Sequence, residues 1–186
     1  KQLLTKDDYD APHPNSENSY GNTYGEHREF LEFNLDQHKI LKSVCEKKGK
    51  VYASSIWDIN SAKEIVSLNP RLIKIPSALN LNFKIINFLF DNYKGQIHLS
   101  IGMTTEEEVN EILTFFKKSK KLDQLVIYYC KSTYPTEEKD LNLNYIKKMI
   151  LDYGNEVAGI GFSGHHTGIS VDVAALTLGA TFFERH

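Results

Sequence analysis

The sequence predicts an α/β fold built on a parallel sheet, and three observations support this. Short runs of β-branched or apolar residues alternate with longer segments whose apolar residues recur at helical spacing. Glycine, proline or polar residues separate the two kinds of segment. Polar residues follow nearly every short run. Strands that are each joined to the next by one helix run parallel, with right-handed crossovers between them.

Six runs are expected to be strands, because each is too short for a helix. They cover residues 51–56, 72–75, 96–101, 125–130, 157–162 and 180–183. The expected helices between them cover residues 60–68, 82–92, 105–118, 141–153 and 169–178. Gly95, Gly154 and Gly179 stand where three of these helices should end.

The residues before the first strand have a different character. Residues 1–23 are rich in Asn, Asp, Ser, Pro and Tyr without apolar periodicity, which predicts a long loop. Apolar residues then recur at roughly helical spacing from about Glu26 to Lys48, which predicts one helix. We therefore expect a loop region, 1–25, that leads into a partial (β/α) barrel domain, 26–186.

Two architectures fit such an alternation: an open doubly wound sheet and a (β/α)8 TIM barrel. Six strands favour the open sheet on count alone. The polar residues at the strand ends favour the barrel, because parallel barrels carry their chemistry at that rim. These residues are Ser54 and Ser55, Lys74 and Ser77, Ser100, Lys131 and Ser132, Ser163 and His165, and Arg185 and His186.

Composition excludes several classes of function. The 22 basic and 24 acidic side chains nearly cancel, and no segment has the basic and aromatic mix that follows a nucleic-acid backbone. No run approaches the roughly 18 apolar residues of a membrane helix, and the first residues lack the apolar centre of a signal peptide. Cys45 and Cys130 have no metal-type spacing and are expected to be reduced thiols in the core. We expect a cytoplasmic protein that binds neither nucleic acid nor membrane.

Lys74 interrupts the otherwise apolar run "IKIPS". The lysine either extends out of the sheet end into solvent or points into the rim, where it would neutralise a phosphate or carboxylate. In the second case Ser77 and Ser100 would supply hydroxyl donors to the same anion.

His165 and His186 follow two consecutive strands. Neighbouring strands lie about 4.8 Å apart, so the two imidazoles could reach one cation, with water or substrate completing its shell. The alternative is that one or both are hydrogen-bonded in loops. His166 should point away from His165. Glu184 either orients a ligand or pairs with Arg185.

The remaining candidates are weaker. Tyr134, before Pro135, either forms a wall over a small polar substrate or only packs. Four other histidines have no comparable setting and are expected to be structural or exposed. They are His13, His27, His38 and His98.

Five segments together resemble the sialic acid synthase (N-acetylneuraminate synthase) family. In chain order they are "SYGNTYGEHREFLEF", "KIPSALNLNF", "HLSIGMTTEEE", "YYCKSTYPTEEKDLNL" and "GFSGHHTGISVDVAALTLGATFFERH". The resemblance implies a (β/α)8 barrel that condenses phosphoenolpyruvate with an N-acylated mannosamine-type sugar. The products are a sialic acid-like nonulosonic acid and phosphate. It also implies a divalent metal, Mn2+ or Mg2+, and a homodimer in the full-length form.

The resemblance assigns roles to particular residues. The expected phosphoenolpyruvate-binding groups are Ser55, Lys74, Ser77, Ser100 and Ser163. His165 and His186 match the family's metal histidines and, with Lys74, form the expected catalytic set. Tyr134 matches a tyrosine that contacts the sugar, and Ser132 stands where some members carry asparagine.

Two departures from the family pattern qualify this assignment. Leu79 stands where the family usually has a carboxylate that handles protons or positions the sugar, so another acid substitutes, the sugar differs, or turnover is lost. The six expected strands correspond to the family's third to eighth. The first two strands, the last helix and the antifreeze-like C-terminal domain have no counterpart among the 186 residues, so we expect a fragment or a split polypeptide.

Two rival functions stay open. One is a metal-dependent or Schiff-base aldolase on the same fold, for which Lys74 is the candidate amine. The other is a non-catalytic sugar-phosphate-binding or assembly subunit, which would explain Leu79 and the missing strands.

Overall fold

A computed structural model describes residues 4–186 of the chain. It divides into two compact units, one ending at Tyr52 and the other running from Ala53 to His186, and each is described by itself. Within the described range no helix is both long and apolar enough to cross a membrane.

The first unit is more helical than the sequence suggested. The expected loop contains α1 (Lys6–Asp10) and a 3-10 turn, η1 (Ser16–Asn18), while residues 1–3 of that loop lie outside the described residues. α1 forms because Thr5 caps it with a reciprocal capping box to Asp8.

The single helix expected between Glu26 and Lys48 is wrong. Two helices occupy this stretch, α2 (Tyr24–Leu31) and α3 (Leu35–Lys47). The break has a local cause, because Asn34 starts α3 as an N-cap with extended backbone and forms a capping box with Gln37.

The second unit contains all six expected strands. They are β1 (Ala53–Ser55), β2 (Leu72–Ile75), β3 (Gln96–Ser100), β4 (Leu125–Cys130), β5 (Gly159–Gly164) and β6 (Phe182–Arg185). β5 and β6 begin and end two residues later than predicted. The helices are α4 (Ile59–Ser67), α5 (Phe83–Asn92), α6 (Glu106–Lys118), α7 (Asn144–Tyr153) and α8 (Ser170–Thr177). Three 3-10 turns complete the unit: η2 (Ser77–Leu79), η3 (Leu122–Gln124) and η4 (Glu138–Asp140).

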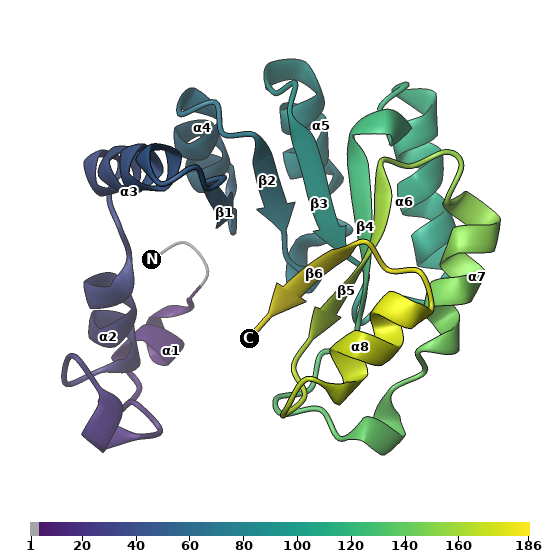
Figure 1. Cartoon of the computed structure of the whole chain (residues 1–186). Helices are drawn as coiled ribbons and strands as arrows, with labels where there is room; N and C mark the ends of the chain where they lie inside the picture. Colours follow the sequence, from purple (N-terminus) through teal and green to yellow (C-terminus); the bar gives the residue numbers. More distant parts are fainter. Residues whose placement is uncertain (1–3) are drawn as a thin grey trace. The chain divides into compact units, whose positions relative to one another are not determined.

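The order of the strands decides between the two architectures (Figure 1). All six run parallel in the order β1-β2-β3-β4-β5-β6. An open doubly wound sheet reverses its strand order to place helices on both faces. Here each right-handed crossover advances in the same direction, so the helices cover one side only. The sheet is therefore a six-stranded parallel half barrel, and the open-sheet alternative is excluded.

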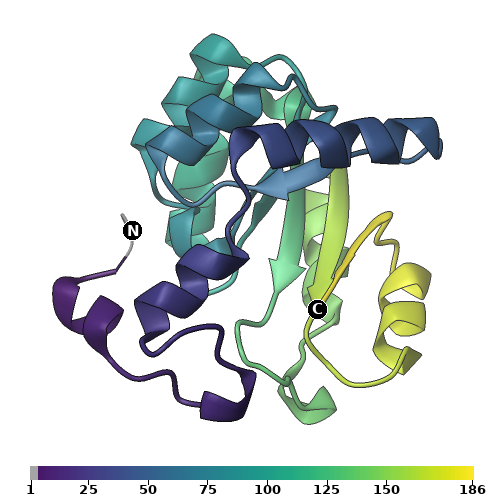
Figure 2. The ribbon, with the colours of Figure 1, turned by 90° about the vertical axis from the view of Figure 1, so that its left-hand side faces the viewer.

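The sheet is strongly curved, which the ribbon shows from a second direction in Figure 2. His98 of β3 and Phe182 of β6 have ring centroids only 5.4 Å apart. Three strand spacings would separate them by about 14 Å in a flat sheet. The two faces also differ in character. The apolar core packs between the outer face and the helices, with Ile73, Leu99 and Ile127 fully buried there.

Candidate functional site

The inner face of the half barrel carries the polar residues of the strands. Side chains alternate between the two faces of a strand, and residues paired across a parallel ladder share a face. The register pairs Ser55 with Lys74, Lys74 with His98, and Ser163 with Glu184. It also pairs Ser100 with Tyr128. The hydrophobic core occupies one face, so these groups collect on the other.

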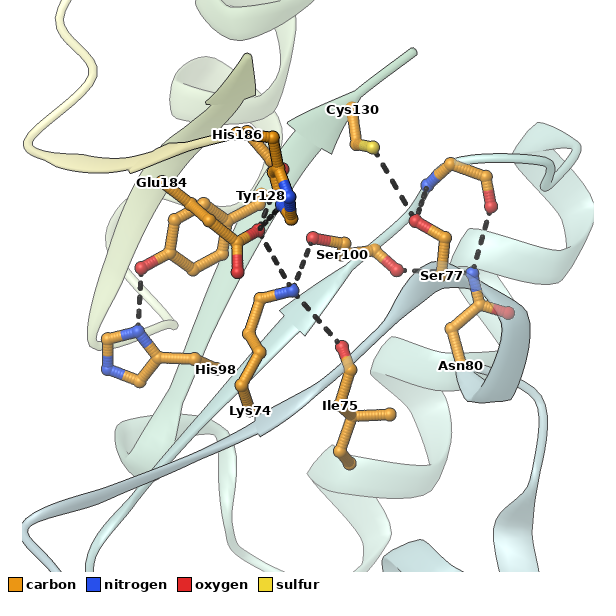
Figure 3. A network of polar contacts seen from close by, with 12 residues as sticks. Lys74, Ile75, Ser77, Asn80, His98, Ser100, Tyr128, Cys130, Glu184 and His186 are labelled. Carbon is orange, nitrogen blue, oxygen red and sulfur yellow. Dashed lines mark hydrogen bonds and ion pairs between the residues drawn. The ribbon is translucent and has the colours of Figure 1, made fainter. Parts of the chain in front are cut away.

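Lys74 is the centre of this polar face, as Figure 3 shows. The residue is only 7% exposed, so the sequence alternative in which it extends into solvent is wrong. Its Nζ donates to Ser100 Oγ at 2.7 Å and to the Ile75 carbonyl at 3.4 Å, and it lies 3.2 Å from Glu184 Oε2. Ser163 Oγ donates to the same carboxylate oxygen at 2.7 Å. Strands β2, β3, β5 and β6 thus meet at one ammonium–carboxylate pair.

The charges of this pair depend on each other. Burial lowers the pKa of the Lys74 ammonium, and the carboxylate of Glu184 opposes that effect. For Glu184, burial acts to raise the pKa, but Lys74, Ser163 and His186 outweigh it and the pKa is lowered. The inner face therefore holds a buried amine whose charged form is disfavoured by burial and favoured by one neighbouring acid.

A second polar cluster lies at the ends of β2, β3 and β4. Ser77 Oγ accepts the Gly102 N–H at 3.1 Å and lies 3.6 Å from Cys130 Sγ, which is itself 3.7 Å from Ser132 Oγ. The buried Asn80 side chain donates to the carbonyls of Ser100 and Gly102, both at 3.1 Å. Asn80 thereby fixes the backbone between the two clusters.

Gly102 lies where the serine hydroxyls converge, and its missing side chain leaves them room. A Cβ there would lie 2.3 Å from Ser132 Oγ and 2.7 Å from Ser77 Oγ, closer than real Cβ contacts. The close approach lets both hydroxyls gather beside one backbone N–H. Ser55 joins the inner face only through its register with Lys74. It is exposed, and the structure shows no side-chain contact between the two.

The structure brings His165 and His186 together, with ring centroids 4.7 Å apart. His165 is buried, and its Nδ1 lies 2.8 Å from the Lys131 carbonyl. Only an N–H can bond to that carbonyl, so Nδ1 carries a proton, and in the neutral ring Nε2 then has a free lone pair. The pKa of His165 is lowered by burial and by His186, while the bond to Lys131 opposes this. His186 is half exposed, and its Nε2 lies 3.9 Å from Glu184 Oε2.

This pair fits a divalent cation that takes further ligands from elsewhere. A histidine that donates one ring N–H to a carbonyl and presents the other nitrogen is typical of metal ligation. Within residues 4–186 no group of three or more His, Cys, Asp or Glu side chains is arranged to hold a metal. Water or substrate oxygen would have to complete the shell.

Tyr134 lies over the histidine pair. Its ring stacks on His165 at 4.0 Å between centroids and meets the edge of His186 at 6.0 Å. The loop around Tyr134 is held by Thr136, which is buried, donates its N–H to the His165 carbonyl at 3.0 Å and donates its hydroxyl to the Thr133 carbonyl at 2.7 Å. The side chain is 67% exposed, so one ring face stays accessible.

Sequence reasoning missed two members of the inner face, His98 and Tyr128. They are linked by a hydrogen bond of 2.7 Å between His98 Nδ1 and the Tyr128 hydroxyl. Lys74 Nζ lies 5.4 Å from the centre of the Tyr128 ring, a cation–π contact. For His98 the signal that could have found it is alternation, because it lies two positions before Ser100, the polar residue that ends β3. Tyr128 has no such signal, since β4 ends at Cys130.

The position of His166 was predicted correctly, and one alternative for Glu184 was wrong. His166 points away from His165 and is buried on the outer side, against Arg185. Arg185 forms its ion pair with Asp172, whereas Glu184 contacts Lys74, Ser163 and His186. Cys45 and Cys130 are free thiols, as expected, but the core position expected for both is confirmed only for Cys130, since Cys45 is partly exposed.

Comparison with known proteins gives one consistent family. The chain is 35% identical over 171 residues to N-acetylneuraminate-9-phosphate synthase of Drosophila melanogaster, covering 92% of this chain and 45% of that protein. It is 29% identical over 157 residues to N,N'-diacetyllegionaminic acid synthase of Campylobacter jejuni, covering 84% of this chain and 46% of that protein. The chain therefore spans about half the length of the curated relatives it matches.

Solved structures give the same result for the fold. The crystal structure of an N-acetylneuraminic acid (sialic acid) synthetase from Leptospira borgpetersenii in complex with citrate matches with a TM-score of 0.80 at 25% identity. That match covers 90% of this chain and 57% of the other. The sequence model described as the NeuB family matches residues 1–186. Because that match extends along the whole sequence, the chain belongs to the NeuB family.

Proposed function

We propose that this chain supplies the substrate-binding half barrel of an enzyme that condenses phosphoenolpyruvate with an N-acylated mannosamine-type sugar. The products would be a sialic acid-like nonulosonic acid and phosphate. The observation that carries the proposal is the buried Lys74 ammonium, with serine hydroxyls nearby, in a chain whose named relatives are nonulosonic acid synthases. Such a group of donors suits a small anion with several oxygens.

Lys74 would bind the anionic end of phosphoenolpyruvate. Its ammonium has three N–H donors, and the contact to the Ile75 carbonyl, at 3.4 Å, is longer than the bond to Ser100. An anionic oxygen could replace the longer contact without disturbing the shorter one. Ser77 and Ser132 would donate to other oxygens of the same substrate, and Ser55 and Ser163 would complete the set. Their effect grows as phosphate leaves, because negative charge then develops in a site with little water.

His165 and His186 would hold the divalent metal, Mn2+ or Mg2+. When bound, such an ion supplies Lewis-acid polarisation of the aldehyde oxygen of the open-chain sugar. The chain's own contribution is orientation. Lys131 fixes the ring of His165 through its carbonyl, and Tyr134 offers its exposed ring face and hydroxyl to the sugar. With Lys74, the two histidines make up the proposed catalytic set.

We also propose that the half barrel is part of a closed (β/α)8 barrel in which its strands are the third to the eighth. The consecutive strand order and the curvature of the sheet support this. The division into residues 1–25 and 26–186, an antifreeze-like C-terminal domain elsewhere, a homodimer and a cytoplasmic location stay predictions.

Phosphate release by the full-length gene product tests the proposal. Phosphoenolpyruvate should release phosphate only when an N-acylated mannosamine and Mn2+ are both present. Lys74→Met should reduce this rate by at least about 100-fold, since a buried charge on the substrate loses its partner. Lys63→Met, which removes an exposed lysine on α4, is the matched control and should retain the rate.

The same assay separates the rival functions. No turnover with several N-acylated sugars would favour a non-catalytic binding or assembly subunit and contradict the proposal. A borohydride-trapped pyruvate adduct on Lys74 would instead show Schiff-base chemistry.

A further inference from the structure

The residues beside the two site histidines form a separate cluster on the outer side of the sheet. His166 follows His165, and Arg185 precedes His186. Arg185 ends β6 and points to the side opposite Glu184, because side chains alternate along a strand. His166 lies in the bend after β5 and is placed on the same outer side by its contacts with Arg185 and with the Cα side of Gly164. Both neighbours meet Asp172 in the first turn of α8, the helix that packs against β5 (Figure 1).

The contacts within this cluster are close. Asp172 Oδ2 lies 3.4 Å from His166 Nε2 and 3.4 Å from Arg185 Nε. Arg185 Nη1 lies 2.9 and 3.1 Å from the two ring nitrogens of His166, and Nη2 donates to the Gly168 carbonyl at 2.8 Å. Because arginine can only donate, the ring nitrogen of His166 that bonds to Arg185 accepts that hydrogen bond, while Asp172 lies within ion-pair distance of both side chains. One carboxylate thus holds both flanking residues.

The members of the cluster differ in burial, and the Arg185 side chain is the most exposed of the three at 36%. The His166 side chain is 1% exposed and that of Asp172 is 20% exposed. The second carboxylate oxygen, Oδ1, is buried and has no hydrogen-bond partner among the described residues.

The backbone connects this cluster to the site. The His186 N–H donates to the Gly164 carbonyl at 3.3 Å, which extends the β5–β6 ladder to the two histidines. The ring of His166 packs over Gly164, where an added Cβ would lie 2.8 Å from Cε1 of that ring. A shift of either outer residue would therefore move the peptide that sets the spacing of the two inner imidazoles.

We propose that Asp172 is a positioning residue for the His165–His186 pair. By clamping His166 and Arg185 on the outer side, it fixes the separation and angle of the two imidazoles on the inner side. This inference rests on the proposed metal-binding role of that pair. It gives α8 a role beyond core packing, because a residue of this helix would hold the two metal-binding histidines in place from the outer side of the sheet.

Metal affinity tests the inference independently of turnover. Mn2+ binding to the full-length protein is measured by titration calorimetry for the wild type, Asp172→Ala and Asp172→Asn. Removing a group bonded directly to a metal ligand weakens metal binding about 10- to 100-fold. Asp172 acts one residue further out, through His166 and Arg185, so we expect the lower end of that range, about 10-fold, for Asp172→Ala. Asp172→Asn keeps one oxygen acceptor and should bind about 3-fold more weakly. Asp172→Glu should restore most of the affinity.

Controls separate positioning from a general loss of stability. Asp91→Asn removes an exposed carboxylate from α5 and should leave Mn2+ affinity unchanged. Urea unfolding in EDTA shows which variants are folded under the titration conditions, and Asp172→Asn serves if Asp172→Ala does not fold. Folded Asp172 variants with wild-type affinity overturn the inference while leaving the proposed metal site intact. A wild type that does not bind Mn2+ overturns both.

Discussion

Lys74 of β2 and Glu184 of β6 form an ion pair, 3.2 Å from Nζ to Oε2, across the inside of the half barrel. Four strand spacings separate these strands along the sheet, which is about 19 Å if the sheet were flat. The pair is therefore a direct consequence of the curvature. It also places an acid beside the cation that we expect to bind phosphoenolpyruvate. A change to this ion pair should therefore affect both the stability of the fold and substrate binding.

Glu184→Gln should destabilise the fold. The change leaves the Lys74 ammonium in a buried position without its counter-charge, a situation that costs several kcal/mol in fully buried pairs. Because the Glu184 side chain is 26% exposed, we expect a smaller loss of about 1–3 kcal/mol in the free energy of unfolding. Urea unfolding at pH 7 measures it.

A double-mutant cycle isolates the pair. Lys74→Met combined with Glu184→Gln should be more stable than the sum of the two single changes predicts, because neither buried charge is then left alone. Strictly additive losses would show that the two side chains do not interact in solution.

His98 should make stability depend on pH in a defined window. Burial, and then the nearby Lys74 charge, lower its pKa from 6.5 to about 4, whereas Glu184 acts in the opposite direction. The unfolded chain therefore takes up a proton at His98 before the folded chain does. The contribution of neutral His98 to the free energy of unfolding is fully present above pH 6.5. It decreases as pH falls towards 4, by up to about 3 kcal/mol.

His98→Gln removes this effect and keeps a polar side chain beside Tyr128. The difference in unfolding free energy between wild type and variant should change between pH 6.5 and 4 and stay constant above that window. A constant difference across the whole range would contradict a buried neutral His98. Lys74 on β2, Tyr128 on β4 and Glu184 on β6 are the titratable groups facing it, and the variant leaves all three unchanged.

The strands were predictable because their chemistry is local. Each apolar run is bounded by glycine, proline or polar residues that end the strand, and the polar residue after the run lies at the carboxyl end of the sheet. The alternation of side chains within each strand also predicts which residues of that strand lie on the inner face. Lys74 and His98 are paired across β2 and β3, but one sequence cannot show this pairing, because it depends on how the two strands align.

The errors have a different origin. The break between α2 and α3 comes from capping by Asn34, which competes with the helical periodicity on either side. The partner of Glu184 depends on curvature across four strands, and nothing local distinguishes Lys74 from Arg185 as that partner. Local capping and long-range closure therefore limit what a single sequence can predict here.

Gly102→Ala should weaken binding of phosphoenolpyruvate more than it affects stability. The added methyl group would meet the hydroxyls of Ser132 and Ser77, which can rotate away, so the fold is retained while the donors move. We expect a rise of about 10-fold in the KM for phosphoenolpyruvate, the cost of a misplaced charge-assisted hydrogen bond. Steady-state kinetics at saturating sugar measures it.

The combination of Gly102→Ala with Ser132→Ala tests this reading. The second change removes the atom closest to the new methyl group, which frees Ser77 to return towards its position. The double variant should have a KM nearer to that of Ser132→Ala alone. A KM unchanged by Gly102→Ala would show that the serines do not contact the substrate.

Leu79→Asp should change the preference for the acceptor sugar. Leu79 packs partly against the core and lines a hollow of about 540 Å3. The other lining residues are Ser77, Ala78, Asn80, Leu81, Asn82, Phe83 and Met103, and none of them is charged. A carboxylate here would accept a hydrogen bond from a sugar hydroxyl that the leucine cannot bind. The ratio of kcat/KM for an N-acylated mannosamine to that for a deoxy analogue should rise by about 10- to 100-fold.

The control for Leu79→Asp is Leu151→Asp, which adds the same charge at an 84% exposed position on α7. It should leave the ratio unchanged, and neither variant should alter the KM for phosphoenolpyruvate by more than about 2-fold, since Lys74 is untouched. An unchanged sugar ratio for Leu79→Asp would place the sugar elsewhere than this hollow. A changed ratio in an active variant would show that the side chain at position 79 selects the sugar and is not needed for turnover itself.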